Sequence, residues 1–248
     1  MKNSTNGVLL VSRLLPQTIA GRLASYGYSC FPLCGSPELT TELGFHPDIL
    51  LCRLPDGSWI TDSGVLAANR MLFDSLGMSV RTADVKLGDS YPNDVPFNAF
   101  FSGNILYCSK HTAQEIRNSA GNAVIFRQGY VKCSILALGN DSFITSDCGI
   151  ARVLQKKGAN VLLIRPGYIG LNGFSCGFIG GASAMLNDNI AVFFGDLRLH
   201  PDCSRIKSFL SELQIDAVSL SGEPLYDYGG LLHVVRYGNS NYMPGKQQ

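Results

Sequence analysis

The sequence predicts an α/β fold, a five-unit propeller that is closed by pairing of its first and last strands. The stretch Asn140–Ile164 reads as turn, strand, aspartate, helix and strand, and Ser58–Val85 follows the same plan. In both stretches the strand ends in an aspartate, Asp62 or Asp147, and a glycine ends the helix. A plan that recurs at this distance along the chain is typical of repeat architectures.

The number of strands predicts the closure. Five copies of strand, helix, strand and strand leave the first strand, Val8–Ser12, and the last, Gly230–Arg236, without hairpin partners. Pairing these two strands removes both exposed edges. We therefore expect a single domain over residues 1–248 that ends in a polar tail at 237–248. The five units are expected at residues 7–61, 62–108, 109–146, 147–195 and 196–236.

The elements follow from local patterns. Helices are expected where apolar residues recur every three or four positions between a starting Ser, Asp or Pro and a closing Gly. They span Pro16–Ser25, Ser63–Leu76, His111–Ser119, Gly149–Lys157 and Pro201–Leu213. Strands are expected at short apolar runs beside turn residues such as Pro55-Asp56-Gly57. Between the first and last, they span Ser29–Leu33, Ile49–Leu54, Ser58–Thr61, Ser79–Ala83, Phe97–Phe101, Ile105–Cys108, Ala123–Arg127, Cys133–Leu138, Ser142–Ser146, Asn160–Arg165, Ala182–Leu186, Ile190–Phe194 and Ala217–Leu220.

A serine or aspartate stands at each junction between a strand and the following helix. These side chains accept hydrogen bonds from the free N–H groups of a first helical turn, so we expect helix caps rather than ligand-binding residues. The five junction residues are Ser12, Asp62, Ser109, Asp147 and Asp196.

Composition excludes several classes of function. The net charge is +1, from 20 basic and 19 acidic residues without a basic stripe, which argues against a nucleic-acid partner. The apolar run after Gly7 has four residues, too few for a signal sequence or a membrane span. We expect a cytoplasmic protein without membrane contact, in which the eight cysteines are reduced.

No cofactor or metal is expected from the motifs. Cys30 and Cys34 have no partner pair at the spacing of a zinc finger, and the chain has no CxxC motif. The glycines between Gly173 and Gly181 do not open a helix after a strand, as a dinucleotide-binding loop would. They fit a pliable loop over a pocket, or a close approach between backbone segments.

The topology resembles that of the pentein superfamily, also called the guanidino-group-modifying enzymes. Its members include arginine and agmatine deiminases, amidinotransferases, dimethylarginine hydrolases and ribosomal anti-association factors. The segments GYVKCS, FITSD and GFIGGAS resemble a divergent bacterial branch of unknown function. The resemblance implies carboxylates that grip a guanidinium group, a histidine in the fourth unit and a nucleophilic cysteine near the C-terminus.

Only the acidic element of these enzymes is matched. Asn93-Asp94-Val95-Pro96 resembles it, with Asp94 as the guanidinium-binding carboxylate; the alternative is an aspartate in a polar turn. Phe178 falls nearest the position of the family histidine. The segment Gly229-Gly230-Leu231-Leu232-His233-Val234 resembles the Gly-Gly-x-x-His-Cys element of agmatine deiminases, but Val234 stands in the place of the nucleophilic cysteine. The usual deiminase chemistry is therefore not expected.

A relocated cysteine is the alternative. The repeat places Asp48, Asp94, Cys133, Gly180 and the segment 227–229 at the mouth of the ring, and a shift of 39 residues carries Asp94 onto Cys133. We expect Cys133 as the nucleophile, Asp94 facing it and His233 as the base. The alternative for Cys133 is a small, partly buried core cysteine. The alternative for His233 is a half-buried histidine with a structural role in an apolar strand.

Further residues are expected to line the pocket. Arg127-Gln128-Gly129-Tyr130 and Arg165-Pro166-Gly167-Tyr168 each follow a strand, and they are either repeated turns or the lining of a site for a carboxylate-bearing ligand. The predicted substrate-binding residues are Asp48, Tyr130, Arg165, Tyr168, Cys176, Phe178 and Asp227.

Three functions remain open at this point. The first is an enzyme that acts on a guanidino or amidino compound bound in a central cleft. The second is a protein that binds a small arginine-like ligand without catalysis, and the third is an interaction module for a macromolecular partner. Convergence of Cys133, Asp94 and His233 on a cavity favours catalysis. Acids without an accessible thiol favour ligand binding, and a filled centre favours the interaction role.

Overall fold

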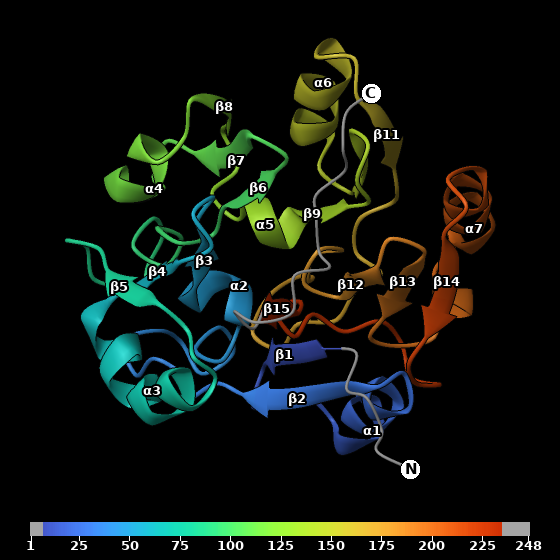
Figure 1. The fold of residues 1–248 in the computed structure, drawn as a ribbon. Coiled ribbons are helices and arrows are strands. Elements are labelled where there is room, and N and C mark those ends of the chain that lie inside the picture. Colours follow the sequence, from blue (N-terminus) through green and yellow to red (C-terminus); the bar gives the residue numbers. More distant parts are fainter. Residues whose placement is uncertain (1–6, 235–248) are drawn as a thin grey trace.

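The computed structural model describes residues 7–234, which form five small sheets arranged around a common centre (Figure 1). Each sheet has three strands, and its middle strand pairs antiparallel with one neighbour and parallel with the other. The sheet orders are β15-β1-β2, β3-β4-β5, β6-β7-β8, β9-β10-β11 and β12-β13-β14. The longer helices lie outside the sheets, whereas α2 and α5 lie nearer the centre (Figure 1).

The strands are short and lie close to the predicted ranges. They are β1 (Gly7–Val11), β2 (Tyr28–Pro32), β3 (Cys52–Arg53), β4 (Trp59–Thr61), β5 (Val80–Thr82), β6 (Phe100–Ser102), β7 (Ile105–Ser109), β8 (Asn122–Phe126), β9 (Ile135–Ala137), β10 (Ser142–Thr145), β11 (Asn160–Leu163), β12 (Ser183–Asn187), β13 (Ile190–Phe193), β14 (Asp216–Ser219) and β15 (Leu232–Val234). The helices are α1 (Gln17–Ser25), α2 (Pro47–Leu50), α3 (Ser63–Ser75), α4 (Gln114–Asn118), α5 (Val131–Ser134), α6 (Cys148–Lys156), the 3-10 helix η1 (Leu197–Leu199) and α7 (Cys203–Glu212).

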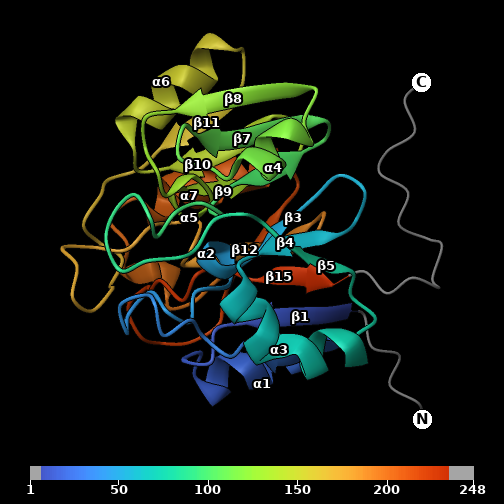
Figure 2. The same ribbon diagram turned by 90° about the vertical axis from the view of Figure 1, so that its left-hand side faces the viewer.

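The first and last described strands pair with each other. β1 runs antiparallel to β15, with Leu9 opposite His233, and the two strands lie side by side in Figure 2. The five sheets remain separate, and residues 7–234 form no closed sheet. The end of the predicted last strand, after Val234, and the tail at 237–248 lie outside the described residues.

Helix α6 illustrates why these sequences form these elements. Asp147 accepts hydrogen bonds from the backbone N–H groups of Gly149 and Ile150, at 2.7 and 2.9 Å, and so caps the first turn. Ile150 and Leu154 are one turn apart and buried against the sheet. Gly158, with a φ of 84°, ends the helix in the left-handed conformation that suits glycine.

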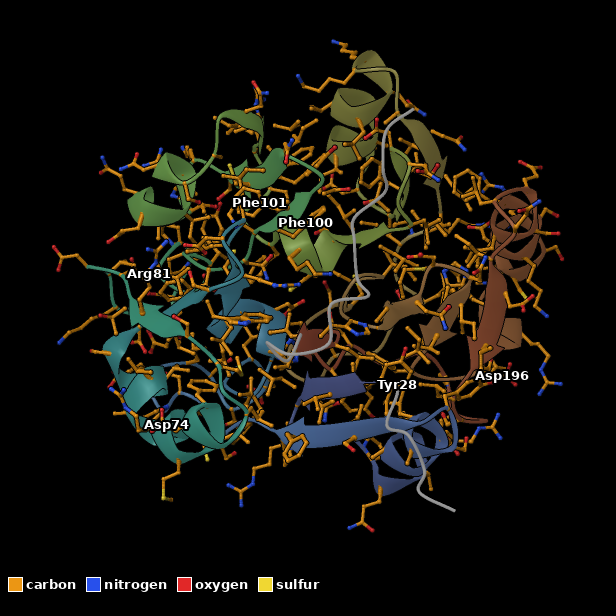
Figure 3. The ribbon with its side chains drawn as sticks, in the orientation of Figure 1. Tyr28, Asp74, Arg81, Phe100, Phe101 and Asp196 are labelled. Carbon is orange, nitrogen blue, oxygen red and sulfur yellow. The ribbon has the colours of Figure 1, made fainter. Side chains whose placement is uncertain are left out.

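The capping prediction is confirmed for Asp62 and Asp147, whereas Asp196 caps the short helix η1 instead of the predicted helix that became α7. Asp62 accepts from Val65 N–H at 2.8 Å at the start of α3, and Asp196 accepts from Arg198 N–H at 2.9 Å at the start of η1. Figure 3 shows Asp196 in the outer part of the molecule. Ser12 and Ser109 each bond the N–H two residues on, but their helices begin later, at other N-cap residues.

The strand predictions over Ile49–Leu54 and Cys133–Leu138 were partly wrong. In both places a short helical turn, α2 or α5, comes first, and a shorter strand follows. Apolar runs of this length fit a buried helical turn as well as a strand, and Pro47 at the first position of α2 favours the helix. These two turns carry Asp48 and Cys133 into the centre.

Among the described residues, no helix is both long enough and apolar enough to cross a bilayer.

Candidate functional site

Hydrogen bonds connect segments of the first, second, third and fifth predicted units at the centre of the molecule. The backbone N–H of Asp48 donates to the carbonyl of Gly229 at 3.2 Å. The side-chain amide of Asn98 donates to the carbonyl of Asp48 at 2.9 Å, and its oxygen accepts from Lys132 N–H at 2.7 Å and Cys133 N–H at 3.3 Å. Asn98 is fully buried, so these bonds hold α2 and α5 in fixed positions on either side of it.

The remaining links run through Gly181. Its N–H donates to the carbonyl of Cys133 at 3.1 Å, and its carbonyl accepts from Tyr228 and Gly230 N–H at 3.0 and 2.9 Å. A Cβ atom at Gly181 would lie 1.8 Å from Oδ1 of Asp227. The glycines of this loop therefore permit the close backbone approach that was one of the two sequence interpretations.

Three buried aspartates, Asp48, Asp94 and Asp227, form what we name the acid cluster. Their exposed fractions are 1, 3 and 1%. Both carboxylate oxygens of Asp48 and Oδ1 of Asp94 have no hydrogen-bond partner among the described residues. Since burial of a carboxylate without partners is costly, these three oxygens mark the centre as a place suited to a cation with several N–H donors.

Cys133 joins the acid cluster through its side chain. Its thiol is 2% exposed, and Sγ accepts a hydrogen bond from Nδ2 of Asn98 at 3.0 Å. The Asp48 carboxylate lies beside the thiol without forming a hydrogen bond of good geometry. Burial raises the pKa of the Cys133 thiol well above its usual value, and the negative charges of Asp48 and Asp227 raise it further. The Cys133 thiol is therefore protonated and neutral near pH 7.

Asp227 is the best-satisfied member of the acid cluster. Oδ2 accepts from Phe178 N–H at 2.8 Å, and Oδ1 accepts from Gly229 N–H at 2.9 Å. Burial raises the pKa of its carboxyl group to about 6, with His46 lowering it and Asp48 raising it.

His46 was missed at the sequence level. It is 2% exposed, its Nδ1 lies 3.6 Å from Oδ1 of Asp227, and this nitrogen has no hydrogen-bond partner among the described residues. The signal that could have identified it is its place two residues before Asp48, which was predicted to lie at the mouth of the ring. Asn98, a polar residue between Phe97 and Ala99, was missed in the same way.

Tyr130 connects Asp94 to an aromatic row. Its hydroxyl donates to Oδ2 of Asp94, and burial together with this hydrogen bond raises the pKa of the phenol. The ring centroid lies 6.2 Å from that of Tyr91 and 5.8 Å from that of Phe178. A Cβ atom at Gly129 would come within 2.5 Å of the Tyr91 ring, which explains the glycine before Tyr130.

His233 takes its contacts elsewhere. Its Nε2 lies 2.8 Å from the carbonyl oxygen of Met185, its ring meets that of Tyr28 edge to face at 5.9 Å, and its backbone lies opposite Leu9 of β1. Burial lowers the pKa of its imidazole. No hydrogen bond joins it to Cys133 or Asp94 in the described part of the chain. Its role as the base stays a prediction.

Arg165 and Tyr168 contact residues of the fifth unit. Arg165 forms an ion pair with Asp202 at 3.2 Å, and the Tyr168 ring lies edge-on to His200 at 5.6 Å. Neither contact involves the acid cluster. Cys176 is half-buried in the glycine-containing loop, and all eight cysteines are free thiols.

No metal site is evident among the described residues. Within residues 7–234, no group of three or more His, Cys, Asp and Glu side chains is arranged to hold a metal ion. Two surface hollows lie away from the acid cluster. One lies between α1 and residues 220–223, and the other lies beside β7, β8 and the end of α6.

Solved structures share this fold at low sequence identity, and no curated protein matches the chain. SxtG, an amidinotransferase of the saxitoxin biosynthetic pathway from Microseira wollei, has a TM-score of 0.57 and 10% identity, over 94% of this chain and 95% of that one. C. jejuni agmatine deiminase has a TM-score of 0.58 and 8% identity, over 94% of each chain. A substrate-bound variant of that deiminase has a TM-score of 0.59 and 10% identity, over 94% of this chain and 95% of that one.

The fold is therefore that of the pentein superfamily, as the sequence resemblance predicted. A family model with the description "family of unknown function (DUF6873)" matches residues 10–232, and the chain belongs to that family.

Proposed function

We propose that this protein binds a small cation of the guanidinium or amidinium class at the acid cluster. The observation that carries the proposal is the burial of Asp48 and Asp94 with three carboxylate oxygens that have no partner among the described residues. A planar cation offers several N–H donors in fixed directions and bonds carboxylates through two atoms at once. Such a ligand supplies both the missing hydrogen bonds and the missing positive charge.

The shape of the fold belongs to the same proposal. We propose a closed five-unit propeller with the ligand in a central cleft. The pairing of β1 with β15 supports it, and so do the hydrogen bonds that join Asn98, Cys133 and Gly181 across neighbouring units. Two of the proteins with a similar fold, an amidinotransferase and an agmatine deiminase, are enzymes of guanidino and amidino chemistry, which also supports the proposal.

Calorimetry and thermal unfolding of the full chain test the binding. Methylguanidine and methylurea have the same shape and differ in charge, so methylguanidine is expected to bind and stabilise the protein while methylurea is not. Asp48→Asn is expected to weaken binding about 10- to 100-fold, the value of a lost charged hydrogen bond. Asp74→Asn is the matched control, because Asp74 is exposed on α3 (Figure 3). Equal binding of methylurea, or unchanged binding by Asp48→Asn, would contradict the proposal.

A second candidate function is covalent chemistry by Cys133. The observation that favours it is the position of the thiol, which accepts from Asn98 and lies beside Asp48. A bound amidinium would neutralise the nearby carboxylates and lower the pKa of the thiol, so that the ligand itself produces the nucleophilic thiolate. The thiol proton would pass to His46 or His233, and Sγ would bond to the amidine carbon while the C=N electron pair moves to nitrogen. The C–N bond to the leaving amine would then break as this imidazole returns the proton to the amine, and water would later displace Sγ from the carbon. Asp94 would hold the amidinium during these steps.

Chloroacetamidine labelling near pH 7, followed by peptide mapping, tests this second function. Cys133 is expected to react faster than the exposed thiols Cys34 and Cys148, which serve as internal controls. Asp94→Asn and excess methylguanidine are each expected to slow the labelling of Cys133 alone. If the exposed cysteines react first and Cys133 stays unlabelled, the site binds without covalent chemistry.

A further inference from the structure

We infer that the ligand of the acid cluster carries a flat aromatic group next to its cation, as an aryl amidine does. This inference rests on the proposed function and specifies the class of ligand. It is built on an aromatic row, which we define as the rings of Tyr91, Tyr130 and Phe178.

The aromatic row runs from the surface towards the acid cluster. The Tyr91 side chain is 51% exposed, whereas Tyr130 and Phe178 are half-buried. Adjacent rings lie 6.2 and 5.8 Å apart, at interplanar angles of 38° and 31°, so their faces are inclined rather than edge-on to each other. Faces in such an arrangement suit both a stacked aryl group and a delocalised cation.

Both inner members of the aromatic row are tied to carboxylates of the acid cluster. The Tyr130 hydroxyl donates to Asp94, and the Phe178 N–H donates to Asp227. The unpartnered Oδ1 of Asp94 belongs to the same carboxylate that Tyr130 contacts. A cation on this oxygen would therefore have its substituent beside the Tyr130 ring, with Tyr91 next along the row.

The charges argue against an amino-acid ligand such as arginine. Of the five ion pairs among residues 7–234, only His46 with Asp227 involves the acid cluster. Arg165, predicted to bind a ligand carboxylate, is instead paired with Asp202. An α-carboxylate close to three buried aspartates would be repelled, because like charges at short range are unfavourable in a poorly solvated site. A neutral aryl substituent avoids that repulsion.

Competition between three ligands tests the inference. Calorimetry on the full chain is expected to show benzamidine binding at least about 10-fold more tightly than arginine, with methylguanidine between them. Tyr91→Ala is expected to weaken benzamidine about 3- to 10-fold and to leave methylguanidine unchanged. Leu199→Ala is the control, because Leu199 is an apolar side chain that is 55% exposed on η1 and is not among the residues expected to bind the ligand. It is expected to change neither affinity.

The outcomes separate this inference from the proposed function. If methylguanidine binds but benzamidine binds no more tightly than arginine, the aromatic inference is overturned and the cation site stands. An equal loss of benzamidine affinity in Tyr91→Ala and Leu199→Ala overturns it as well. If none of the three cations binds, both proposals fall together. Unchanged methylguanidine affinity in Tyr91→Ala shows that this variant is folded.

Discussion

Burial and the nearby Asp48 raise the pKa of Asp227, whereas His46 lowers it. The titration of this single residue gives a prediction about stability. Its pKa is raised from 3.8 to about 6, mainly by burial, so the folded protein holds this proton more tightly than the unfolded chain. The resulting stabilisation is complete below the unfolded pKa and is lost as the pH rises through the folded pKa. The stability of the wild type relative to Asp227→Asn is expected to fall by about 3 kcal/mol between about pH 3 and pH 7.

Urea denaturation of both proteins across this pH range measures the difference. Asp74→Asn, at an exposed position, provides the control and is expected to show no such trend. A difference that is constant, or that grows as the pH rises, would rule out the raised pKa of Asp227.

Tyr130 gives a second prediction at this scale. Tyr130→Phe removes the one hydrogen bond that Asp94 receives among the described residues, and the empty protein is expected to lose about 1–3 kcal/mol of stability. Because a bound cation replaces the lost donor, benzamidine is expected to bind more tightly to this variant. Tyr28→Phe, which removes a 2.5 Å hydrogen bond to the Leu186 carbonyl, is expected to lose stability without gaining affinity. Equal affinities in the two variants would contradict the role of Tyr130.

At the scale of an element, helix α6 depends on its cap. Asp147→Ala removes the acceptor for Gly149 and Ile150 N–H and is expected to lower the free energy of unfolding by about 0.5–2 kcal/mol. Asp147→Asn keeps an acceptor oxygen and is expected to lose much less. Neither change is expected to alter cation binding, as measured by calorimetry. A loss of affinity in Asp147→Ala would revive the ligand-binding interpretation of the junction residues.

The helices and their caps could be predicted because the signals are local. Asp147, the apolar residues one turn apart and Gly158 all lie within one short segment. The turns α2 and α5 could not be predicted in this way, since an apolar run next to a strand has no periodicity long enough to separate helix from strand. The strand predicted to begin at Cys133 was therefore wrong at its start, because Cys133 lies in α5.

At the scale of the whole molecule, Asn98 connects three units. Asn98→Ala removes its bonds to Asp48, Lys132 and Cys133, and leaves buried backbone groups unpaired. We expect a loss of about 2–5 kcal/mol in urea denaturation together with loss of cation affinity. Asn69→Ala provides the control, because Asn69 is as buried but bonds Cys34 and Val65 near α3. Retained affinity in Asn98→Ala would show that the site does not need this connection.

The centre of the molecule marks the limit of prediction from the sequence. Counting strands was enough to predict that β1 meets β15, because each lacked another partner. The contact of His46 with Asp227 depends on how segments of the first and fifth units approach each other. No local sequence pattern encodes the distance between residues so far apart in the chain. For the same reason, the contact between His233 and the carbonyl of Met185 could not be predicted.

The pairing of β1 with β15 also constrains how the chain folds during synthesis. Val8 pairs with Val234, so the partner of one of the earliest strands is among the last described residues to leave the ribosome. Until β15 has been synthesised, the edge of β1 that will pair with it stays exposed. The other edge of β1 can already pair with β2. Contacts this distant in sequence form slowly and expose edges that invite aggregation. Expression at lower temperature or with chaperones is therefore expected to raise the yield of soluble protein.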